Sequence, residues 1–73
     1  MVVPEKFSPI RYEILLINAE ILKLNGRIQY LLEQIKEFTG NPHENVLRDS
    51  NNVTIQIYRG QTRHAVRRLN LLT

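Results

Sequence analysis

The chain of 73 residues contains no cysteine and no tryptophan, and only two histidines, His43 and His64. The absence of cysteine excludes disulfide bonds and thiolate zinc sites, and two histidines alone argue against a structural metal site built from protein ligands. We therefore expect no metal and no cofactor. A domain this short is close to the lower limit of independent stability and usually depends on disulfides, metals or oligomerisation. With the first two unavailable to this chain, the sequence favours oligomerisation.

Long apolar runs are also missing. The longest, Ile14–Ile17, is far too short to cross a membrane. The N-terminal residues do not show the basic region followed by an apolar stretch that marks a secretory signal. We therefore expect a cytoplasmic or intracellular protein with no membrane partner.

The residues that enzymes use for catalysis are sparse. The three glycines, Gly26, Gly40 and Gly60, are scattered and form no phosphate-binding loop. The pair His43-Glu44 begins like the zinc-protease motif, but Leu47 occupies the position of its second histidine. We expect a protein that is not an enzyme and that has no catalytic residues.

Helix start and stop signals divide the chain. Ser8 followed by Pro9 is typical of a helix N-terminus, and Gly40 is typical of the position just past a helix end. The apolar periodicity between them predicts a helix over residues 9–39. Residues 1–8 are predicted to be a flexible arm, and residues 9–73 a single small oligomeric domain.

The second half of the chain gives mixed signals. Asn41, Pro42 and Glu44 resemble a capping box that opens a short helical segment, 42–48, followed by a turn over 49–52. Residues 53–58 alternate with period two and are β-branched, which predicts a short extended segment, and residues 61–72 are predicted to form an amphipathic helix. An alternative is that residues 42–72 form one broken helix, which pairs with 9–39 as a plain hairpin. The expected fold class is mostly α in either case.

The strongest pattern is a heptad repeat of apolar residues, called the seam below. Isoleucine at every first core position and leucine at the central second positions favour a parallel two-stranded coiled coil, whereas the isoleucines at 10 and 17 favour more strands. No ion pair across the flanking positions specifies parallel pairing, so antiparallel pairing stays open. We expect the seam to be the interface of a homo-oligomer, with a dimer favoured; its packing within a compact monomer is the alternative. Its members are Ile10, Ile14, Ile17, Ile21, Leu24, Ile28, Leu31, Ile35 and Phe38.

The N-terminal half of the long helix is apolar on a second side as well. These residues are Tyr12, Leu15, Leu16, Ala19 and Leu22. A free coiled coil has no need of a second apolar face. We expect the C-terminal helix to dock there through Ala65, Val66, Leu69 and Leu72, after the extended segment has carried the chain back.

The net charge of +3 is concentrated at one end of the chain, because residues 59–73 contain four arginines and no acidic residue. Arginine suits phosphate and carboxylate oxygens, and a repeated basic face in an oligomer would attract anions. We therefore expect a small adaptor or regulator that presents this face to a partner such as an acidic protein. A regulator that binds nucleic acid is one alternative, and a solvated basic face that only keeps the chain soluble is another. The expected anion-binding residues are Arg59, Arg63, His64, Arg67 and Arg68.

Overall fold

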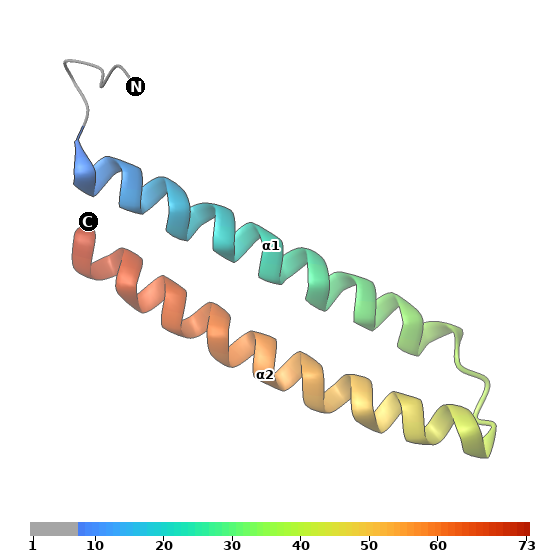
Figure 1. The fold of residues 1–73 in the computed structure, drawn as a ribbon. Coiled ribbons are helices and arrows are strands. Elements are labelled where there is room, and N and C mark those ends of the chain that lie inside the picture. The colour runs from blue at the N-terminus through green and yellow to red at the C-terminus, as the bar shows by residue number, and fades with distance from the viewer. Residues whose placement is uncertain (1–7) are drawn as a thin grey trace.

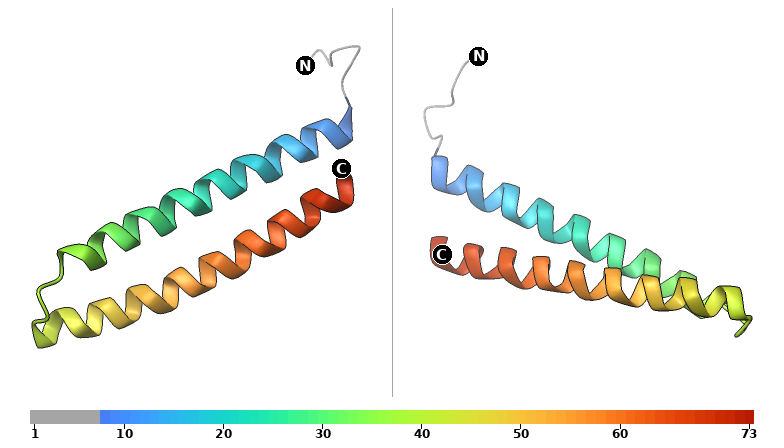
Figure 2. Two further views of the ribbon diagram at one scale, coloured as in Figure 1. Left: turned by 180° about the vertical axis from the view of Figure 1, so that it is seen from behind. Right: turned by 60° about the horizontal axis from the view of Figure 1, so that its bottom comes forward.

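The computed structural model describes residues 8–73, which form two long α-helices joined by a short loop (Figure 1). Helix α1 spans Pro9–Glu37 and helix α2 spans Pro42–Leu72. They run antiparallel, so the end of α2 returns to the start of α1 (Figure 2). The mostly α prediction is confirmed. The predicted arm, residues 1–8, lies outside the described residues except for Ser8.

The start of α1 follows the predicted signal. The Ser8 side chain accepts a hydrogen bond from the Arg11 backbone N–H at 3.4 Å, and Pro9 occupies the first turn, where no donor is needed. The helix ends at Glu37, two residues before the predicted end. Phe38 is already extended, and its N–H donates to the Ile35 carbonyl at 3.2 Å.

The conformation of the loop between the helices depends on Gly40 and Glu44. Gly40 has φ +88°, a left-handed conformation that glycine adopts at little steric cost. Asn41 is extended, as expected for a residue before proline. The predicted capping box is not formed as such: the Asn41 side chain makes no cap bond, and Glu44 reaches further back to Thr39. Its Oε2 accepts from the Thr39 backbone N–H at 2.6 Å and from the Thr39 hydroxyl at 2.9 Å.

The favoured division of the second half is wrong, and the alternative, a helix over residues 42–72 that pairs with the first helix as a hairpin, is the arrangement that forms, without the expected break. The helix does not end at 48, residues 53–58 are not extended, and no separate helix begins at 61, because α2 is continuous from Pro42 to Leu72. The alternating residues point to opposite sides of this helix. Ile55 is buried, with 2% of its surface exposed, whereas Val53 and Ile57 are 61% and 55% exposed. The three alternating residues that suggested a strand therefore lie on a helix, and only the middle one, Ile55, is buried against α1.

Local preference is outweighed here by hydrogen bonding and packing. A lone strand leaves its backbone groups unpaired, whereas a helix pairs them within itself. The hydroxyls of Thr54 and Thr62 donate to the carbonyls of Ser50 and Tyr58, four residues back, so both side chains are satisfied inside the helix. Gly60 lies within the helix, where glycine costs only about 1 kcal/mol relative to alanine.

The seam of α1 packs against α2 of the same chain. Ile17 and Leu24 are buried, and the other members are half-buried except for Ile10, which is 56% exposed. The facing positions on α2 also recur at alternating spacings of four and three, and all are buried or half-buried. They are Asn51, Ile55, Tyr58, Thr62, Ala65, Leu69 and Leu72. The two helices of the hairpin thus pack along their length through the seam of α1 and the matching stripe of α2.

The predicted docking of the C-terminal segment on the second apolar side of α1 does not occur. Ala65 is fully buried, while Leu15 and Leu22 on that second side are 66% and 73% exposed. Antiparallel pairing through the seam places α2 on the opposite side of α1. The second apolar side is therefore left on the surface of the hairpin.

Substitutions at neighbouring positions distinguish the helix from a strand. We expect Ile55→Ala to lower the free energy of unfolding by about 2–4 kcal/mol, because it opens a cavity at the seam. We expect Val53→Ala to change it by about 0.5 kcal/mol at most, because Val53 is exposed and alanine is the better helix former. Urea unfolding followed by circular dichroism measures both values. Equal losses would contradict the helix, since a strand presents both side chains on one face.

The hydrogen bonds between Glu44 and Thr39 in the loop should make an acid-sensitive contribution to the free energy of unfolding. The Thr39 N–H and hydroxyl bind the ionised carboxylate, so they lower the pKa of Glu44 from its ordinary value of 4.5. Because the folded pKa is the lower one, the contribution is complete above about pH 4.5 and is lost as the pH falls through the folded value. We expect Glu44→Gln to remove this part of the pH dependence of unfolding. Thr39→Val, which keeps the backbone donor, retains part of it; a full loss in that variant would contradict the assignment.

Candidate functional site: an arginine row on one side of the hairpin

Three arginines form a row along one side of α2. Arg59, Arg63 and Arg67 follow one another at four-residue intervals, and all are exposed. Side chains four apart in a helix lie on one face, so the row extends about 12 Å along the axis at 1.5 Å per residue. Among the described residues, no carboxylate forms an ion pair with any of the three. The row therefore carries three uncompensated positive charges.

Two open grooves follow this row, and none of the described residues that line them is acidic. Asn25, Ile28, Gln56, Arg59, Thr62 and Arg63 line the first. Thr62, Arg63, Val66, Arg67 and Asn70 line the second. Amide, hydroxyl and guanidinium groups are thus gathered beside two apolar side chains, an arrangement that can hold an anionic group through several hydrogen bonds at once.

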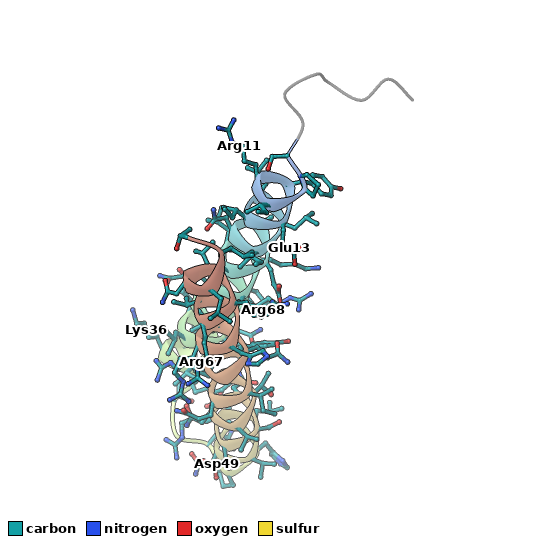
Figure 3. All side chains as sticks on the ribbon, turned by 90° about the vertical axis from the view of Figure 1, so that its left-hand side faces the viewer. Arg11, Glu13, Lys36, Asp49, Arg67 and Arg68 are labelled. Carbon is teal, nitrogen blue, oxygen red and sulfur yellow. The ribbon has the colours of Figure 1, made fainter. Side chains whose placement is uncertain are left out.

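The other two residues of the predicted anion site lie elsewhere. Arg68 donates to the Glu20 carboxylate at 2.6 Å, and the two side chains are 44% and 46% exposed. In Figure 3, Arg67 lies on the same side of the hairpin as Arg11 and Lys36, whereas Arg68 lies toward the side of Glu13. His64 is exposed and precedes Arg68 by four residues, so it lies on the same side of α2 as Arg68. The predicted set of five is therefore divided, and three of its members lie together.

Tyr58 belongs to the side opposite the row. It lines a groove with Lys23, Gly26 and Tyr30, and its ring lies 5.7 Å from the Arg27 guanidinium carbon. This distance suits a cation–π contact between the two helices. Tyr58 therefore contributes to hairpin packing, and its ring is held away from the arginine row.

The amides beside the row were missed by reasoning from charge alone. Gln56 precedes Arg59 by three residues, and Asn70 follows Arg67 by three, so helical spacing places each next to the row. Asn25 comes from α1, and only the pairing of the two helices brings it to the groove. A search for polar residues at helical spacing from the arginines finds the first two, but not the third.

Neither a metal-binding cluster nor a membrane-spanning helix accompanies the arginine row in the part of the chain that the structure describes. Within residues 8–73, no cluster of three or more histidine, cysteine, aspartate or glutamate residues could hold a metal ion. Neither α1 nor α2 has the length and apolarity needed to cross a membrane. Comparison of the chain with protein-family models, with curated proteins and with solved structures finds no match. The geometry of the surface is therefore the basis for assigning a function.

Proposed function

We propose that the chain is a non-enzymatic interaction module that self-associates and presents its arginine row to an acidic partner protein. The observation that carries the proposal is the row itself: three arginines follow one another along α2, and the described residues that line the grooves beside them include no carboxylate. No carboxylate of residues 8–73 forms an ion pair with these arginines, so their charge is available to an external anion.

The composition of the two grooves favours a protein partner. Ile28 lies in one and Val66, which is 39% exposed, lies in the other. A protein segment can offer carboxylates to the arginines and apolar side chains to these residues at the same time. Specific protein interfaces combine an apolar centre with polar and charged groups around it, which matches this mixture.

Self-association is supported by how little the hairpin buries. Only Ile17, Leu24, Ile55 and Ala65 are buried among residues 8–73. Many large apolar side chains remain exposed, and exposed apolar surface of this extent marks interaction sites in soluble proteins. Because the predicted interface, the seam, is engaged within the chain, association of intact hairpins would use other faces.

A second function, nucleic-acid binding, is favoured by the spacing of the row. Arginines one helical turn apart can follow successive phosphates, and the neighbouring amides are suitable donors to phosphate oxygens. This function predicts a strong salt dependence, because each phosphate contact releases a counterion. Three contacts would weaken binding about 40-fold between 50 and 200 mM salt.

Two double variants with the same net charge test the role of the row. We expect Arg63→Gln/Arg67→Gln to weaken binding of an acidic peptide probe by about tenfold or more, because two charge-assisted hydrogen-bond donors are lost. Arg48→Gln/Arg68→Gln removes two charges outside the row and should retain binding. Fluorescence anisotropy with a labelled glutamate-rich peptide and with single- and double-stranded DNA, each over a salt series, measures the affinities.

The outcome also separates the two functions. Tighter binding of the peptide, with a shallow salt dependence, supports the protein partner, whereas tighter binding of DNA with a steep dependence supports the alternative. Equal losses in the two double variants would show that only net charge matters and would overturn the assignment of the row. Circular dichroism should show unchanged helicity, because exposed charges contribute about 1 kcal/mol or less to folding.

A further inference from the structure

The side of α1 that faces away from α2 carries a second stripe at heptad spacing. This outer stripe consists of Leu15, Ala19, Leu22 and Gly26, separated by four, three and four residues, and all are exposed. At about 100° per residue it lies about 160° around α1 from the seam. Heptad spacing is the pattern by which a helix keeps one side against another helix. The hairpin itself supplies no helix on that side.

Gly26 indicates that a helix packed on the outer stripe would approach α1 closely. Glycine is among the least favourable residues inside a helix. A Cβ built on Gly26 would meet nothing within 4 Å, so no contact within the described hairpin requires a glycine there. Gly60 in α2 also faces open space, and Val53 and Ile57 precede it at heptad spacing, but the positions that follow are His64 and Arg67, so no apolar stripe continues on both sides of it.

Large and small residues alternate along the outer stripe in a way that suits antiparallel pairing of two copies. Leu15 and Leu22 occupy one heptad position, and Ala19 and Gly26 occupy the other. In an antiparallel pair, Leu22 lies opposite Ala19 of the second copy, and Leu15 lies opposite Gly26 of the second copy. Every layer then contains one large and one small residue, which packs evenly. A parallel pair would instead stack leucine on leucine and glycine on glycine.

The residues that flank the stripe are compatible with the same pairing. Leu16 lies opposite Lys23 of the second copy, whose aliphatic stem can cover it, and Asn18 lies opposite Asn25 of the second copy, where the amides can bond to each other. No two like charges oppose each other across this contact. A stripe that complements itself under a two-fold axis is what a symmetric dimer interface requires.

We propose that the outer stripe of α1 is the self-association surface, and that a second copy of this chain occupies it in the antiparallel direction. The inference rests on the self-association proposed above and names the surface that performs it. The seam stays within each hairpin, so two folded hairpins associate without opening.

Sedimentation equilibrium at micromolar concentration tests the surface with a matched pair of variants. We expect the wild-type chain and Leu71→Glu to be dimers and Leu22→Glu to be a monomer of unchanged helicity. Leu71 is the fitting control because it is 82% exposed and lies on α2. A monomeric wild type would overturn both the proposed self-association and this surface. A dimeric Leu22→Glu would overturn the surface alone.

Glycine variants repeat the test without adding a charge. Both Gly26→Ala and Gly60→Ala favour the helix, so both chains should fold. We expect Gly26→Ala to raise the dimer dissociation constant about tenfold, because the added methyl overfills the layer opposite Leu15, whereas Gly60→Ala leaves it unchanged. Equal constants in the two variants would contradict close approach at Gly26.

Introduced cysteines test the direction of pairing, because the chain contains no cysteine of its own. In the antiparallel pair the two copies of position 15 are eleven residues apart along the axis, or about 16 Å, beyond disulfide reach. We therefore expect Leu15→Cys to remain uncross-linked on oxidation and the double variant Ala19→Cys/Leu22→Cys to form a covalent dimer. Rapid cross-linking of Leu15→Cys would show parallel pairing and overturn the proposal.

Discussion

The packing of the seam of α1 on the facing stripe of α2 is the constraint on which the rest of the structure depends. It buries Ile17, Leu24, Ile55 and Ala65 and fixes the rotation of both helices about their axes. Once those rotations are set, every other side chain is assigned to a side of the hairpin. The arginine row, the Arg68–Glu20 pair and the outer stripe are therefore consequences of one contact.

Much of α1 could be predicted from local signals, because they act within a few residues. Ser8 and Pro9 start the helix as expected, Gly40 adopts the left-handed conformation that a helix end favours, and the heptad pattern marks the side that is packed. The continuity of α2 could not be predicted in this way. Val53, Ile55 and Ile57 fit a strand locally, and only a packed partner along the whole of α2 selects the helix. The facing stripe is also obscured by Asn51 and Thr62, which are polar members of an otherwise apolar pattern.

The candidate site was predictable in composition but not in arrangement. The excess of arginine after residue 58 is plain from the sequence, and helical spacing joins Arg63 to Arg67. The separation of Arg68 from them depends on Glu20, a carboxylate 48 residues earlier in the chain. Asn25 likewise reaches the groove from α1. Long-range pairing of this kind is specified by the hairpin as a whole, and no local window contains it.

The outer stripe and the arginine row are related through the geometry of a helical hairpin. The outer stripe faces almost directly away from α2, so two hairpins joined through it place four helices side by side in one layer, with the two copies of α1 in the middle. A two-fold axis between antiparallel, side-by-side helices runs perpendicular to that layer. Rotation about such an axis does not exchange the two faces of the layer. The arginine rows of the two copies therefore lie on the same face. In the proposed dimer, self-association therefore doubles the proposed anion-binding surface on one side, which favours a partner with two acidic segments or one long one.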